Sequence, residues 1–200
     1  MIILGLTGSI GMGKTTAANQ LRKMGVPVHD ADDVVHKLTG KGGKAVPLVG
    51  DAFPGVVFGG TVDRGRLGAR VFSDDRALHR LEAILHPLVH DEERAFLRRC
   101  RNQRKKVVAL DIPLLFEVKG EDRVDAIAVV SCPKFLQEQR VMKRRGMTHG
   151  KLKAIRQRQL PDSEKRRHAH FVIPTGAGRR ASLIALRRAM TVLKAHKPRR

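Results

Sequence analysis

The chain has 200 residues, enough for one α/β domain with insertions, and its 40 Lys and Arg residues outnumber 19 Asp and Glu residues, which gives a formal net charge of +21. Polyanions are natural partners of so positive a chain, but Tyr and Trp are absent, so stacking platforms for single-stranded nucleic acid are scarce. A signal peptide and a membrane span are not expected, because the first residues hold only a short apolar run and no later apolar segment approaches the ~20 residues of a span.

A glycine-rich motif follows the first predicted strand. Residues 2–6 form a short apolar run typical of a buried parallel strand, and residues 8–15, G-S-I-G-M-G-K-T, match G-x-x-x-x-G-K-[ST] at every fixed position. Residues 15–24 then show the apolar spacing of a helix. In such a phosphate-binding loop (P-loop), main-chain N–H groups and the helix N-terminus bind phosphate. The motif predicts that a nucleoside triphosphate binds here, with Lys14 on its β- and γ-phosphates and the Thr15 hydroxyl on Mg²⁺.

Acidic residues follow the second predicted strand. We expect this strand at residues 26–29, followed by Asp30-Ala31-Asp32 and a helix over residues 33–38. The carboxyl ends of parallel strands are where open α/β sheets place their chemistry, so one carboxylate is a candidate functional group. Capping of the next helix is the competing interpretation.

The middle of the chain reads as an insertion. Residues 39–61 are rich in Gly and carry two Pro, so no regular element longer than a turn or two is expected there. Apolar residues at helical spacing begin near Val62-Asp63-Arg64 and continue to Val89. The dipeptide His86-Pro87 should bend or restart the helix, and a further helix is expected over residues 89–101.

A second acidic position ends the third predicted strand, residues 107–111. Asp111 occupies the place of the carboxylate that holds Mg²⁺, directly or through water, in phosphate-loop enzymes. Residues 112–117 form an unusually apolar loop that we expect to line a pocket. A fourth strand is predicted at residues 125–131 and a last short one at residues 171–174, before a closing amphipathic helix at residues 181–193.

Two Arg-rich helices lie between the fourth and the last strand. They are predicted at residues 135–145 and 151–159, around the glycines at 146 and 150, and Arg140 and Arg144 are expected to share one helical face. Arg pairs phosphate oxygens through its planar fork, so the pair suits a lid that closes on a triphosphate.

Taken together and in order, these segments resemble the dephospho-CoA kinases. The resemblance rests on G-L-T-G-S-I-G-M-G-K-T at 5–15, V-H-D-A-D at 28–32, V-D-R-G-R-L-G-A-R-V-F at 62–72, L-E-A-I-L-H-P-L-V at 81–89, D-I-P-L-L-F-E at 111–117, Q-E-Q-R-V-M-K-R at 137–144 and H-A-H-F-V-I-P-T-G at 168–176. His36, His170 and Thr175 depart from the family pattern, which often has Arg, Asp and Asn there.

The resemblance implies one P-loop kinase domain over residues 1–200: an α/β fold with an open parallel sheet flanked by helices. Its core would be about 1–32, 105–136 and 166–200, its helical acceptor-binding insertion about 33–104, and its lid about 137–165. The implied activity is transfer of the γ-phosphoryl group of MgATP to the ribose 3′-hydroxyl of dephospho-CoA. The implied site residues fall into three groups: Gly11, Met12, Gly13, Lys14, Thr15 and Thr16 around the phosphates; Asp32, Lys14, Arg140 and Arg144 in catalysis; Asp32, His86, Pro113 and Leu114 on the acceptor.

The sequence also allows comparison with three other classes of protein. A related P-loop kinase for another hydroxyl or a nucleoside monophosphate would share the loop and lid but not the H-P and P-L-L-F-E segments. A regulatory GTPase fits badly, since D-x-x-G and N-K-x-D motifs are missing. A basic nucleic-acid-binding protein is a third alternative, in which the positive charge, including the run at 197–200, would serve the main function. We expect only incidental electrostatic binding of nucleic acid. Cys100 and Cys132 match no metal-binding spacing and, with the P-loop, indicate a reducing cytoplasm; the sequence leaves the oligomeric state open.

Overall fold

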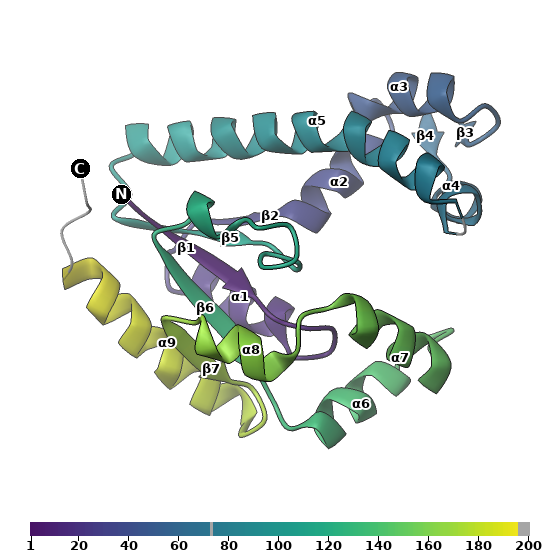
Figure 1. The fold of residues 1–200 in the computed structure, drawn as a ribbon. Coiled ribbons are helices and arrows are strands. Elements are labelled where there is room, and N and C mark those ends of the chain that lie inside the picture. Colours follow the sequence, from purple (N-terminus) through teal and green to yellow (C-terminus); the bar gives the residue numbers. More distant parts are fainter. Residues whose placement is uncertain (73, 196–200) are drawn as a thin grey trace. The chain divides into compact units, whose positions relative to one another are not determined.

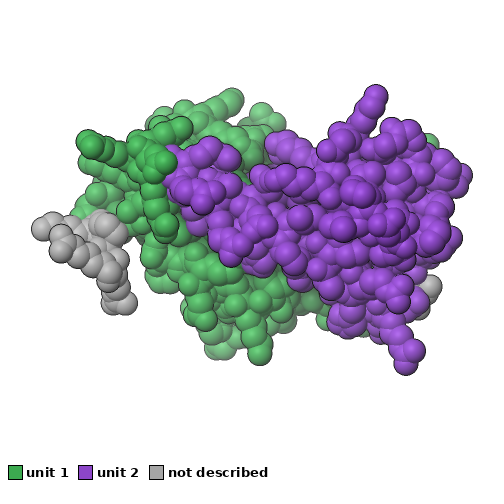
Figure 2. Space-filling view, turned by 90° about the horizontal axis from the view of Figure 1, so that it is seen from above, with its two compact units in different colours: residues 1–29, 100–200 green, residues 30–99 purple. Residues whose placement is uncertain are grey.

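The computed structural model describes residues 1–72 and 74–195, and the basic run at 197–200 lies outside them. The chain divides into two compact units (Figure 2): residues 1–29 with 100–200, and residues 30–99. The first, here the core unit, contains almost all of the sheet (Figure 1). The second is here called the insertion unit.

Within the described residues, the main sheet has five strands in the order β2-β5-β1-β6-β7. Their bounds are β1 Ile2–Thr7, β2 Val28–Asp30, β5 Val107–Asp111, β6 Ala126–Ser131 and β7 Phe171–Pro174. Strand β1 pairs in parallel with β5 and β6, and β6 with β7. The chain leaves β1 towards β2 on one side and leaves β6 towards β7 on the other. The order therefore reverses beside β1, which is where open α/β sheets bind ligands.

Helices cover the sheet of the core unit. Their bounds are α1 Lys14–Lys23, α6 Lys134–Met142, α7 His149–Arg158, α8 Asp162–Arg167 and α9 Gly178–Ala195, with a 3₁₀ turn η1 at Glu121–Arg123. Helices α1 and α9 pack on each other and bury Leu21 and Leu186 against the apolar strands. All of β5 is buried, as expected for a parallel strand enclosed on both faces. This core holds the loops at the strand ends in place.

The insertion unit has its own apolar core. Its elements are α2 Ala31–Thr39, α3 Ala45–Ala52, the antiparallel pair β3 Val57–Phe58 and β4 Thr61–Val62, α4 Arg64–Val71, and most of α5 Asp75–Asn102. Leu38, Val49, Phe53 and Leu81 are buried together in it. Asp63 caps α4 by accepting a hydrogen bond from the Arg66 N–H, at the start expected from the sequence.

The structure departs from two expectations for this unit. Residues 39–61, expected to be irregular, contain α3 and the β3–β4 hairpin; Pro47 is tolerated because it lies in the first turn of α3. The sequence predicted that the helix bends or restarts at His86-Pro87; it does not restart, since α5 is one continuous helix through Pro87 (Figure 1). Leu81 and Leu85 before the proline, and Leu88 after it, pack on the same core, and this packing outweighs the lost hydrogen bond.

Within residues 1–72 and 74–195, the structure has no helix that is both long and apolar enough to cross a bilayer.

Candidate active site

The P-loop connects β1 to α1. Gly11 and Gly13 have φ values of +75° and +91°, in the left-handed region that favours glycine. Gly13 is the N-cap of α1, and no side chain accepts a hydrogen bond from the main-chain N–H groups of the first turn. The first turn of α1 holds no acidic residue. This end of α1 has the backbone chemistry of an anion site.

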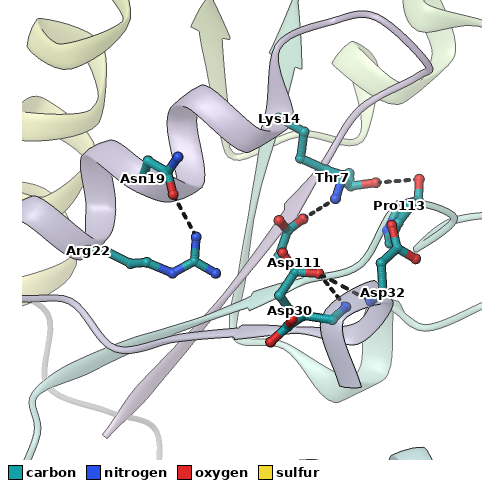
Figure 3. Close-up of polar contacts among 9 residues, drawn as sticks. Thr7, Lys14, Asn19, Arg22, Asp30, Asp32, Asp111 and Pro113 are labelled. Atoms are coloured by element: carbon teal, nitrogen blue, oxygen red, sulfur yellow. Dashed lines mark hydrogen bonds and ion pairs between the residues drawn. The ribbon is translucent and has the colours of Figure 1, made fainter. Parts of the chain in front are cut away.

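Lys14 and Asp111, two predicted site residues, meet at the end of the central strands (Figure 3). The Lys14 Nζ atom lies 2.5 Å from Asp111 Oδ1, and the Asp111 side chain is 1% exposed. Asp111 ends β5, opposite Leu6 of β1, so the sheet register brings its carboxylate beside the P-loop. Sequence reasoning placed Lys14 in the P-loop and Asp111 at a strand end but did not predict that they form an ion pair.

Met12 is anchored beneath the loop. Its side chain is 4% exposed, and its Sδ atom accepts from the Cys132 N–H at 3.3 Å. Its N–H donates to the Ser9 carbonyl and its carbonyl accepts from Thr175, so Met12 supports the loop from within. Burial raises the pKa of the Cys132 thiol, and the nearby Arg140 opposes this rise. Cys132 is thus a buried thiol that favours its neutral form.

Arg140 is held close to the P-loop through Thr175. Its Nη1 and Nη2 atoms donate to Thr175 Oγ1 at 3.2 Å and to the Thr175 carbonyl at 2.7 Å. The Thr175 hydroxyl donates in turn to the Met12 carbonyl at 2.5 Å. Thr175 was noted in the sequence only as a departure from the family pattern; here it joins the loop after β7 to the P-loop. Only knowledge of the fold could have found this link, because the two residues lie far apart in the chain.

Arg144 is not where the sequence placed it. Helix α6 ends at Met142, so Arg144 lies in the turn beyond it, exposed, and does not share a helical face with Arg140. Gly146, in the left-handed region at φ +73°, follows in the same turn. The prediction assumed that the helix continues past Arg144, but α6 ends two residues before it.

Two glutamines from the predicted lid bind the P-loop. Gln137 of α6 donates from Nε2 to the Ile10 carbonyl at 2.8 Å, and Gln159, after α7, accepts from the Ile10 N–H at 3.2 Å. Arg156 donates to Gln137 Oε1 at 2.8 Å and 3.2 Å. Of these three, only Gln137 lay in a motif noted in the sequence, and none had been assigned a role.

Asp30 caps α2 in the insertion unit. Its Oδ1 atom accepts from the N–H groups of Asp32 and Asp33 at 3.1 Å and 3.2 Å (Figure 3). The capping interpretation is therefore correct for Asp30, whereas the Asp32 side chain is exposed and is not the cap. His86 is also exposed, within α5. Both belong to the insertion unit, and their functional roles stay predictions.

The apolar loop after β5 is partly buried. The Thr7 hydroxyl donates to the Pro113 carbonyl at 3.2 Å, which ties this loop to the end of β1 (Figure 3). Leu115 and Phe116 are buried, but Leu114 is 40% exposed. Leu114 is thus available to a ligand, while Leu115 and Phe116 belong to the interior.

Comparisons with known proteins agree on one family. The family model described as dephospho-CoA kinase matches residues 2–179. The dephospho-CoA kinase of Paramagnetospirillum magneticum is 62% identical over 83% of this chain and 78% of its own length. That of Rhodospirillum rubrum is 56% identical over 96% of this chain and 92% of its own.

The fold agrees as well. The crystal structure of TT1252 from Thermus thermophilus, 34% identical, superposes with a TM-score of 0.81 and covers 96% of each chain. A Campylobacter jejuni dephospho-CoA kinase structure, 21% identical, has a TM-score of 0.67 over 96% of each chain. The sheet with its P-loop is thus a P-loop kinase fold, and the chain belongs to the dephospho-CoA kinase family of ATP-dependent kinases.

Proposed function

We propose that this protein transfers the γ-phosphoryl group of MgATP to the 3′-hydroxyl of the ribose of dephospho-CoA, giving CoA and ADP. The observation that carries the proposal is the ion pair of Lys14 and Asp111 directly beside a P-loop, in a chain of this family. Phosphoryl transfer needs positioned substrates and compensation of negative charge more than covalent help. The site offers both.

The P-loop binds the triphosphate. The N–H groups of Gly11, Gly13, Lys14 and Thr15 face the phosphates, since those of Met12 and Thr16 already donate to the Ser9 and Gly13 carbonyls. Gly13 is the N-cap of α1, so the positive end of the helix dipole faces the phosphates. Lys14 bridges the β- and γ-phosphates and moves from Asp111 to do so. Arg140 and Arg144 close on the triphosphate with the lid, about residues 137–165.

The residues at the loop fit Mg²⁺. The exposed Thr15 hydroxyl in the first turn of α1 and the Asp111 carboxylate supply two hard oxygen ligands. Mg²⁺ takes few protein ligands and fills its octahedron with water and phosphate oxygens, so two are sufficient. When bound, the ion offsets the charge that develops on the phosphates. Thr15 and Asp111 would hold it.

Asp32 prepares the acceptor. Because Asp30 supplies the cap of α2, the Asp32 carboxylate is left for another task. We assign it the proton of the 3′-hydroxyl, which it orients and accepts as the oxygen attacks the γ-phosphorus. His86, Pro113 and Leu114 bind the rest of the acceptor, with residues 33–104 as the acceptor-binding insertion of a single kinase domain.

A coupled ADP-release assay tests the proposal. Purified protein is incubated with ATP and Mg²⁺, and the rate of ADP release is compared among four acceptors: dephospho-CoA, AMP, adenosine and shikimate. We expect rapid ADP release with dephospho-CoA and not with the other three acceptors. Faster release with any of the other three would overturn the substrate assignment, and release without an acceptor would indicate a hydrolase.

A further inference from the structure

A fully buried lysine lies outside the proposed phosphate site. Lys165 of α8 is 0% exposed, and its Nζ atom lies 2.8 Å from Oε1 of Glu117, the last residue of the apolar loop after β5. Lysine is almost never fully buried unless it is paired. The Glu117 side chain is itself only 15% exposed, so the carboxylate and the ammonium ion hold each other's charge inside the protein.

The same carboxylate oxygen binds the main chain of the predicted lid. The Leu160 N–H, in the link between α7 and α8, donates to Glu117 Oε1 at 2.8 Å. Oε1 therefore accepts the Leu160 hydrogen bond and faces the Lys165 ammonium ion, whose Nζ atom makes an ion pair but no hydrogen bond in the described chain. The Glu117 Oε2 atom is buried without a hydrogen-bond partner in the described chain, so the interactions of this carboxylate concentrate on Oε1.

The residue before Leu160 binds the P-loop. Gln159 Oε1 accepts from the Ile10 N–H at 3.2 Å. The dipeptide Gln159-Leu160 is thus held at two points, by its main chain to Glu117 and by a side chain to the P-loop. The Ile10 carbonyl accepts a second hydrogen bond, from Gln137 of helix α6. A movement of Leu160 would therefore change the hydrogen bonding of the P-loop itself.

We propose that Glu117 is a positioning residue for phosphoryl transfer: with its charge balanced by Lys165, it fixes Leu160 so that Gln159 holds Ile10 of the P-loop. The kinetic part of this inference rests on the proposed kinase activity. The structural part, from Glu117 through Leu160 and Gln159 to Ile10, does not. The competing explanation is an ion pair that contributes only to folding.

Two double variants separate the explanations. Glu117→Gln/Lys165→Met and Glu117→Leu/Lys165→Met both remove the two charges together, so neither leaves a buried charge unpaired. Gln at position 117 retains a carbonyl oxygen for the Leu160 N–H, whereas Leu does not. Both variants are made in the full chain and assayed well below the melting temperature of the less stable one. The measured quantities are kcat and the KM values for ATP and for dephospho-CoA.

We expect kcat of the Leu variant to fall at least about tenfold below that of the Gln variant, since a small misplacement in an active site costs up to ~10²-fold. The Gln variant should stay within about threefold of the unmodified protein. Equal kcat values in the two variants, high or low, would overturn the proposal, because the Leu160 acceptor would then not matter.

Amide hydrogen exchange at Ile10 supplies a readout that needs no turnover. Exchange should be faster in the Leu variant than in the Gln variant, and Gln159→Leu should reproduce the increase. Adding Gln159→Leu to the Leu variant should then change little, because both act on one contact. Unchanged exchange at Ile10 in the Leu variant would refute the positioning role, whereas an inactive unmodified protein with the expected exchange pattern would refute only the proposed function.

Discussion

Gly11→Ala tests how tightly α6 packs on the P-loop. A Cβ atom at residue 11 would lie 2.5 Å from Val141 Cγ2 and 3.0 Å from the Gln137 carbonyl oxygen. The left-handed backbone costs a non-glycine residue roughly 1–2 kcal/mol, and overpacking adds about 1–3 kcal/mol. We therefore expect a loss of about 2–5 kcal/mol in the free energy of unfolding.

Gly25→Ala is the matched control. Gly25 has almost the same φ, +77°, but no atom lies within 4 Å of its Cβ position, so this variant should lose only about 1–2 kcal/mol. Urea denaturation measures both, and titration calorimetry measures their affinity for ATP. In Gly11→Ala the loop should move to relieve the clash and lose one N–H contact to phosphate. This loss should weaken ATP binding about tenfold, and Gly25→Ala should bind ATP normally. Equal destabilisation and equal ATP affinity in the two variants would refute the packing argument.

Four further predictions follow from the site. Asp32→Asn should leave ATP binding largely intact and lower kcat at least ~10²-fold; near-normal turnover in steady-state kinetics would exclude Asp32 as the base. Lys14→Ala should weaken ATP binding in calorimetry and lower the melting temperature, because it removes the ion pair with the buried carboxylate of Asp111; unchanged ATP affinity would contradict the P-loop assignment. Arg140→Ala should lower kcat by ~10³-fold or more, and an effect confined to melting temperature would show a purely structural arginine. Because burial raises the pKa of its thiol, Cys132 should react with iodoacetamide at neutral pH far more slowly than a free thiol such as glutathione, and equally rapid labelling of the native protein would show that the thiol is accessible.

Much of the core unit could be predicted from the sequence, because its signals are local. The P-loop motif, the apolar run before it and the carboxylate at the end of residues 107–111 each indicate a strand end. In a parallel sheet, such ends meet at one edge. That geometry places Lys14 and Asp111 at the same edge, although the ion pair between them was not predicted.

Contacts between distant segments could not be predicted. Thr175 reaches Met12, and Gln159 reaches Ile10, only because β7 and the predicted lid lie beside the P-loop in the folded core unit. A hydroxyl or an amide side chain carries no local signal of such a partner. The sequence motifs pointed to the phosphates and not to the residues that support the loop.

Local rules also failed where packing opposed them. Pro87 normally ends a helix, but apolar residues on both of its sides pack in one core and α5 continues. In α6 the error was the reverse, since the helix ends at Met142 although the sequence after it remains compatible with a helix. Helix ends are decided by the contacts that the last turns make.

The position of the transferred phosphate tests the central claim most directly. The protein is incubated with ATP, Mg²⁺ and dephospho-CoA, and the product is examined by ³¹P NMR, with 3′-deoxy-dephospho-CoA as the matched control acceptor. The proposed function predicts a phosphate on the ribose 3′-oxygen and no turnover of the 3′-deoxy compound. Phosphate at any other position, or phosphorylation of the 3′-deoxy compound, would contradict it.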